Sequence, residues 1–183
     1  VSPLLSDPVR GVRIKAVSLL AGVSDAQLSG TDRERLKSAT QEFLAAQALN
    51  ADRPEARATL GGFYARQGQA SAAEAEYKAA LRLSPAFGPA AANLADLYRQ
   101  KKNFDKALEY FERVRSTEGG SDASLEKSIT ETHIRRFDHL LSELDPANPE
   151  HVPQIEQLKR EKTAYQLDDA RLLHVKPHRL RRI

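Results

Sequence analysis

The chain has 183 residues, a formal net charge of +3 and no cysteine, methionine or tryptophan. The lack of cysteine excludes disulfides, thiolate metal sites, thiol nucleophiles and covalent haem attachment within the chain. No apolar run approaches the roughly 18 residues that span a bilayer, so we do not expect the chain to cross a membrane. Its many alanine, leucine and charged residues, with only 6% aromatics, are typical of packed helices.

The first predicted helix covers residues 7–22. Asp7 can cap this helix, Pro8 suits its first position, and Gly22 marks its end. Apolar residues follow on one face at helical spacing: Val9, Val12, Ala16, Leu19 and Leu20. The segment resembles the second helix of a HEAT repeat, on the residues Asp7, Pro8, Val12, Arg13, Ala16 and Leu20.

A second helix is predicted from Thr31 to about Asn50, after a connection over residues 23–30. Thr31 and Glu34 have the spacing of a capping box. The helix ends before Pro54, which follows Asp52 and Arg53. Its inner face carries Leu36, Ala39, Phe43 and Ala46. We expect the HEAT-like helix to lie beside it.

From residue 54 onward the same residue types return after 34 positions. The clearest pairs are Leu60 and Leu94, Tyr64 and Tyr98, Ala73 and Ala107, and Tyr77 and Phe111. A fixed period of this length indicates a helical repeat array. Each unit of such an array buries its apolar face by stacking on its neighbours.

This pattern resembles the tetratricopeptide repeat over about residues 31–115, as a half repeat followed by two full ones. Gly61 stands where a small residue lets the two helices of a repeat approach, and Tyr77 where an aromatic fills the space beside them. The second repeat departs from the pattern at Lys102, which takes the place of the turn glycine Gly68.

The last third of the chain does not continue the repeat. The sequence predicts a flexible joint at 117–121, a helix over about 122–143, a turn at 145–149 and a second helix to about residue 169. A short connection between two amphipathic helices predicts an antiparallel pair.

We therefore predict an all-α fold, a right-handed α-solenoid of tetratricopeptide-like helix pairs followed by an antiparallel helical hairpin. The predicted segments are a HEAT-like helix with its connection (1–30), two and a half repeats (31–116), the hairpin (117–170) and a basic tail (171–183).

The order of these elements also resembles the C-terminal helical region of bacterial multihaem c-type cytochromes. The resemblance rests on the Asp-Pro helix, on residues 49–56, and on residues 60–68 together with 93–98. The chain lacks every Cys-x-x-Cys-His motif, so none of the haem chemistry carries over. The resemblance implies one alternative function, a haem-free accessory region of an electron-transfer assembly.

The tetratricopeptide resemblance implies a concave surface, lined by the first helices of the repeats, that binds an extended peptide or a partner helix. The candidate groove residues are Arg66, Asn93, Asp96, Arg99 and Gln100. Arginine can pair with a carboxylate bidentately, and asparagine can hold a backbone amide. The family's clamp for a chain-terminal carboxylate is incomplete, because Ala58 and Gly62 offer no side-chain donor.

No group of residues indicates catalysis, a cofactor or a metal site, and we expect no enzymatic activity. His174 and His178 have the spacing of a helical ligand pair, but Pro177 between them disfavours a continuous helix. Cations gather in the basic tail at Lys176, Arg179, Arg181 and Arg182. They suggest a second alternative, an adaptor for nucleic acid or a membrane surface.

We favour a non-enzymatic scaffold that binds another protein or peptide through the concave face, the hairpin or both. A cytochrome or another subunit of a larger assembly is a candidate partner. Nucleic acid is disfavoured, because no aromatic residue is interleaved with the tail cations for base stacking. The compartment stays open between bacterial periplasm and cytoplasm.

Overall fold

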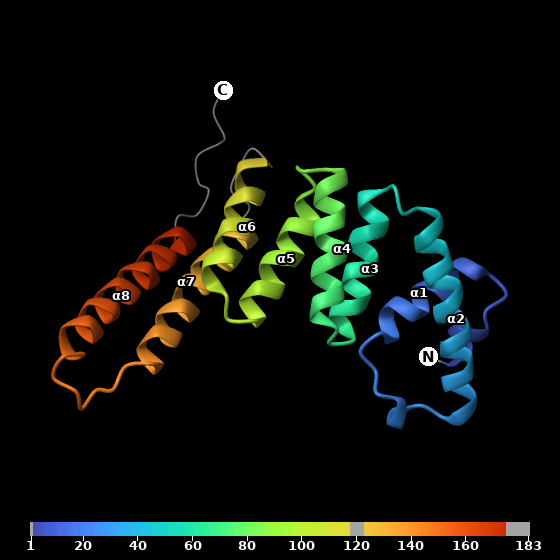
Figure 1. Cartoon of the computed structure of the whole chain (residues 1–183), viewed down its shortest axis with the longest axis horizontal. Helices are drawn as coiled ribbons and strands as arrows, with labels where there is room; N and C mark the ends of the chain where they lie inside the picture. Colours follow the sequence, from blue (N-terminus) through green and yellow to red (C-terminus); the bar gives the residue numbers. More distant parts are fainter. Residues whose placement is uncertain (1, 118–122, 175–183) are drawn as a thin grey trace. The chain divides into compact units, whose positions relative to one another are not determined.

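The computed structural model describes residues 2–117 and 123–174, and this part of the chain is helical with no strand (Figure 1). Its α-helices are α1 (Arg10–Leu20), α2 (Gly30–Leu49), α3 (Pro54–Arg66), α4 (Ala70–Leu83), α5 (Gly88–Gln100), α6 (Phe104–Thr117), α7 (Ala123–Ser142) and α8 (Val152–His174). Two short 3-10 helices, η1 (Ser2–Ser6) and η2 (Asp25–Gln27), precede and follow α1. The predicted all-α class is confirmed.

The chain forms two compact units, residues 1–97 and residues 98–183. The division falls inside α5, so the end of this helix, from Tyr98 onward, belongs to the second unit. The four segments predicted from the sequence stay a prediction. They were defined by sequence pattern, whereas the two units are defined by compactness, so one division does not test the other.

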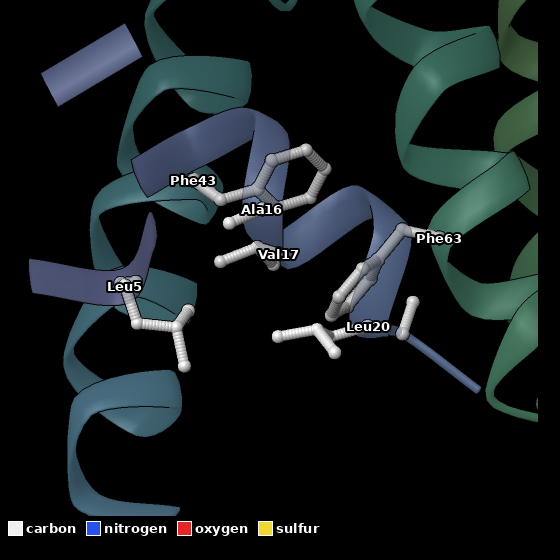
Figure 2. Close-up of a cluster of buried hydrophobic side chains, with 8 residues drawn as sticks. Leu5, Ala16, Val17, Leu20, Phe43 and Phe63 are labelled. Atoms are coloured by element: carbon white, nitrogen blue, oxygen red, sulfur yellow. The ribbon is translucent and has the colours of Figure 1, made fainter. Parts of the chain in front are cut away.

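A core of the first unit lies where η1, α1, α2 and α3 meet. Figure 2 shows six of its side chains turned toward one another: Leu5, Ala16, Val17, Leu20, Phe43 and Phe63. The ring centroids of Phe43 and Phe63 are 4.9 Å apart. The N-terminal helix α1 therefore packs beside α2, as expected. Its assignment to the HEAT type stays a prediction.

The first helix begins later than the sequence indicates. Asp7 does not cap α1, and Pro8 is not its first residue, because α1 begins at Arg10 with Val9 as N-cap. The Asp7 carboxylate instead accepts a hydrogen bond from the backbone N–H of Val9, at 2.8 Å. The Asp7 side chain therefore closes a short turn with the backbone just before the helix starts, instead of capping the helix.

The second helix begins one residue earlier than predicted, at Gly30. Ser29 is its N-cap, and the Ser29 hydroxyl accepts a hydrogen bond from the backbone N–H of Asp32 at 3.1 Å. The predicted cap at Thr31 is thus wrong. The Ser29 hydroxyl, two residues before Thr31, makes the N-cap hydrogen bond instead, and Thr31 lies inside the first turn of α2.

Helices α3 and α4 form the pair predicted for the first full repeat. Pro54 is the first residue of α3, where its missing N–H costs no hydrogen bond. Gly61 lies against the ring of Tyr77, since a Cβ on Gly61 would come within 2.7 Å of the Tyr77 Cδ1 and Cε1 atoms. An ion pair between Arg57 and Glu76, at 3.0 Å, also joins the two helices.

The 34-residue period recurs in the backbone geometry of the turns. Gly68 has a φ of +73° and Lys102 a φ of +58°, so both adopt the left-handed conformation. The turn hydrogen bonds also correspond. In the first turn, Gly68 N–H donates to Ala65 O and Gln69 N–H donates to Tyr64 O. In the second turn, 34 residues later, Lys102 N–H donates to Arg99 O and Asn103 N–H donates to Tyr98 O. The second turn therefore keeps the repeat geometry although it lacks the glycine.

In the second unit, α7 packs against α6. Ion pairs join Arg136 to Asp105 at 2.9 Å and Arg115 to Glu126 at 3.8 Å. The buried residues of α7 are Leu125, Ile129, Thr132 and Phe137. Thr132 is fully buried, and its hydroxyl donates a hydrogen bond to the Ser128 carbonyl at 2.6 Å.

Helices α7 and α8 form the predicted antiparallel hairpin. The His133 ring stacks on the Tyr165 ring with centroids 4.3 Å apart, and farther along α7 Lys162 forms an ion pair with Asp138. Residues later in α7 thus meet residues earlier in α8. Helix α8 continues to His174, beyond the end predicted at about residue 169.

Candidate functional site

The structure divides the five predicted groove residues between the two units. Arg66, at the end of α3, and Asn93 and Asp96, on α5, belong to the first unit. Arg99 and Gln100, at the end of α5, belong to the second. The single groove expected from the sequence stays a prediction, and the residues of each unit are described separately.

The first-unit site surrounds the hydroxyl end of Tyr77. Burial raises the pKa of Tyr77, while the charge of Arg66 lowers it and the charge of Asp96 raises it again. Both charged groups are thus close enough to act on the Tyr77 hydroxyl. Arg66 and Asn93 are exposed and Asp96 is half-buried. Because Tyr77 is buried, the groups that this arrangement offers to a bound surface are those of Arg66, Asn93 and Asp96.

The second-unit site is a groove of about 390 Å³ between the end of α5, the following turn and α7. We call it the basic groove. Its lining residues are Arg99, Gln100, Lys102, Phe104, Arg135, Asp138, His139 and Ser142. The structure therefore brings Arg99 and Gln100 together with side chains that the sequence did not single out.

Ion pairs fix the guanidinium groups at one side of the basic groove. Glu131 lies 3.4 Å from Arg99 and 2.6 Å from Arg135. The hydrogen bond from Arg135 is the main reason that the pKa of Glu131 is lowered. The Arg99 guanidinium also lies 5.9 Å from the centre of the Phe111 ring, a cation–π distance. Arg99 is therefore held in place before any ligand arrives.

A second hollow of about 390 Å³ adjoins the basic groove and shares Lys102, Phe104 and His139 with it. The other residues that line this hollow are Lys101, Asn103, Asp105, Arg136, Leu140 and Glu143. Asp105 forms an ion pair with Arg136 at 2.9 Å, and Glu143 lies 3.5 Å from His139, an ion pair only when this histidine is protonated.

The first unit has a further hollow, of about 320 Å³, at the turn between α2 and α3. It is lined by Gln47, Asn50, Arg53, Glu55, Ala56 and Thr59. Its one basic side chain faces its one acidic side chain, because Arg53 lies 3.9 Å from Glu55. This hollow carries no excess charge that would select a ligand.

The sequence pointed to half of the basic groove only. Arg99 and Gln100 follow from the repeat register, which assigns them to the last turn of a first helix. Arg135, Asp138 and Ser142 come from α7, whose later part follows no repeat pattern. The signal that could have found them is the i, i+3 and i, i+4 spacing of polar residues over 135–142 on the predicted helix.

The predicted tail cations Lys176, Arg179, Arg181 and Arg182 lie outside the described residues. Within the described part, no helix combines the length and the apolar character needed to cross a bilayer.

Comparison with known proteins supports the repeat. A family model described as tetratricopeptide repeat matches residues 64–125, about one third of the chain. No curated protein matches the chain. The match supports a tetratricopeptide-type repeat in this segment and, with the helical structure, the predicted α-solenoid class. It reaches Leu125, which is buried in α7, beyond the limit of about residue 115 expected from the sequence.

Repeats of this type generally mediate protein–protein interaction, and they are typically non-enzymatic scaffolds. The match does not extend to the HEAT-like helix or to the cytochrome-like order of elements. Those two resemblances stay predictions.

Proposed function

We propose that this chain is a non-enzymatic scaffold that binds a partner protein through its repeat region. The observation that carries the proposal is the basic groove, in which Arg99 and Gln100, two residues chosen from the repeat register, line the same hollow. Grooves of this size, with a few placed polar groups, are suited to hold side chains of a bound segment.

The residues around the groove support binding of an extended segment. Gln100 has an amide that can both donate to and accept from a peptide backbone. The Ser142 hydroxyl donates to the His139 carbonyl at 2.6 Å, so its oxygen can accept a hydrogen bond from a peptide N–H. Repeat proteins use surfaces of this kind to hold extended ligands.

Site-specific photo-crosslinking tests the proposal. A photoreactive phenylalanine analogue is placed at Gln100 in the full chain, within its native host, and crosslinked proteins are identified by mass spectrometry. The matched control carries the same analogue at Lys37, an exposed position on α2. We expect a defined protein to crosslink from position 100 and not from position 37.

The variant Gln100→Ala supplies the second half of this test. With the crosslinker moved to Ser142, Gln100→Ala should weaken capture of the same protein while the circular dichroism spectrum stays unchanged. Equal capture from positions 100 and 37, or no capture from either Gln100 or Ser142, would contradict the proposal.

A further inference from the structure

Lys102 adopts the left-handed backbone conformation, which the turn of the repeat requires but which glycine adopts more favourably than lysine. It is the one non-glycine residue with a positive φ in the described part of the chain. The corresponding residue of the preceding repeat is Gly68, which adopts this conformation without a Cβ penalty. Residues held in such conformations often mark functional sites.

The position of Lys102 suits its side chain to ligand binding. Lys102 lines both the basic groove and the adjoining hollow. No ion pair joins it to a carboxylate anywhere in the part of the chain that the structure describes. Its ammonium group is therefore a cation that lines a hollow and has no counter-ion among residues 2–117 and 123–174.

The charges around the two hollows are also unbalanced. Five arginines and lysines line them, against three acids, and Glu131 beside the basic groove is the counter-ion of Arg99 and Arg135. One of these acids, Asp138, is paired with Lys162, which lies outside both linings. Asp105 and Asp138 are thus neutralised by neighbouring cations, whereas among the described residues no carboxylate pairs with Lys102.

We propose that the basic groove and the adjoining hollow bind an acidic segment of the partner protein, with Lys102 as the residue that selects its carboxylate. This proposal rests on the proposed scaffold function and names the chemistry of the bound segment. A side-chain carboxylate would pair with Lys102, and Arg135 lines the same groove, while the Gln100 amide and the Ser142 hydroxyl oxygen would hold the segment's backbone.

The surface fits an acidic peptide better than a nucleic acid. A phosphate backbone needs a continuous track of cations, but here Asp105, Asp138 and Glu143 interrupt the track. The aromatic lining residue Phe104 is nearly buried, so it offers no open face on which a base could stack. An acidic peptide does not need a continuous track, because each of its spaced carboxylates can form an ion pair with one cation of the surface.

Fluorescence anisotropy with the full chain tests the proposal. The probe is a labelled ten-residue peptide made of two Ser-Asp-Glu-Leu-Asp units, blocked at both ends so that it has no terminal carboxylate. A matched peptide carries Asn and Gln in place of the acids, and a ten-nucleotide oligothymidine replaces the peptide in a third titration. We expect the acidic peptide to bind at least about ten-fold more tightly than either competitor.

Lys102→Gly is the decisive variant, because it removes the charge and also relieves the backbone. We expect it to weaken acidic-peptide binding about five- to twenty-fold, the loss of one charge-assisted pair, without lowering the melting temperature. Lys102→Arg should bind within about two-fold of the unaltered chain, and Arg135→Gln should weaken binding as Lys102→Gly does. Lys159→Gln, on the exposed face of α8, controls for net charge and should change nothing.

Each other result overturns the proposal. Equal affinity for the acidic and amide peptides would show that carboxylates do not determine binding. Tighter binding of oligothymidine would show that the surface favours nucleic acid. Equal losses in Lys102→Gly and Lys159→Gln would indicate net charge alone, and no binding would end the proposal. If the partner crosslinked at Gln100 is captured equally by the Lys102→Gly variant, the scaffold function stands and the acidic-segment inference fails.

Discussion

The ring of Tyr77 on α4 lies directly against Gly61 on α3. A Cβ at Gly61 would sit 2.7 Å from two carbons of the ring, much closer than atoms in van der Waals contact. The approach of the two helices in this repeat therefore depends on the missing side chain at Gly61.

We predict that Gly61→Ala lowers the free energy of unfolding by about 1–3 kcal/mol, since the added methyl group overpacks the Tyr77 ring. The neighbouring residue provides a matched control. A Cβ at Gly62 would lie no closer than 3.7 Å to other atoms, so Gly62→Ala should raise stability by about 0.5–1 kcal/mol through helix propensity. Urea denaturation of both variants measures the contrast, and equal effects would contradict this packing.

Removing the repeat aromatics should create cavities. Tyr77 and Phe111 are 3% and 2% exposed. We predict that Tyr77→Ala and Phe111→Ala each destabilise the chain by about 3–5 kcal/mol. Tyr77→Phe keeps the ring and should cost about 1 kcal/mol or less. Unchanged thermal melting in either alanine variant would mean that the 34-residue register is wrong.

The repeat register is also the part of the fold that the sequence predicted best. Tyr77 and Phe111 recur because each is buried on the second helix of its repeat, so the pattern reports tertiary packing directly. Helix starts were predicted less well. Ser29 and Thr31 can both cap a helix. The packing of α2 against its neighbours, rather than either residue alone, sets where the helix begins.

The basic groove was half predicted for a related reason. Arg99 belongs to the repeat and could be placed by register. Arg135 lines the groove because α7 packs beside α6. The polar spacing over 135–142 marks one face of the helix, but it does not say which element that face meets. The sequence marked Lys102 as a departure from the repeat, but its positive φ and its place between two hollows required the structure.

Lys102 and Gly68 allow a reciprocal test of backbone strain. We predict that Lys102→Gly raises the free energy of unfolding by about 0.5–1.5 kcal/mol, because a side chain in the left-handed region costs energy that glycine avoids. Gly68→Lys should lower it by a similar amount, about 0.5–1.5 kcal/mol, for the same reason. Chemical denaturation measures both, and a destabilised Lys102→Gly variant would show that the side chain contributes more than the strain.

The ion pair between Arg13 and Glu42 should make stability depend on acid pH. Arg13 donates from Nη2 to one carboxylate oxygen of Glu42 at 2.7 Å and from Nε to the other at 3.1 Å. These hydrogen bonds are the main reason that the pKa of Glu42 is lowered, with burial opposing the shift. The stabilisation is therefore complete above the unfolded-state pKa of glutamate, near 4.3, and is lost as pH falls through the lower pKa of the folded chain.

Melting temperatures of the unaltered chain and of Glu42→Gln, measured from pH 7 to pH 3, check this prediction. The unaltered chain should melt higher at pH 7, and the difference should narrow as the pH falls below 4. A difference that stays constant over this range would show that Glu42 does not act through its charge.

The most direct measurement of the central claim, that the groove beside α5 and α7 binds a peptide segment, is an amide chemical-shift titration of the isotope-labelled full chain with the blocked Ser-Asp-Glu-Leu-Asp peptide. We predict saturable shifts concentrated at residues 99–105 and 135–142, which disappear when the amide peptide is used. Shifts confined to α1 and α2, or none at all at saturating peptide, would contradict the account.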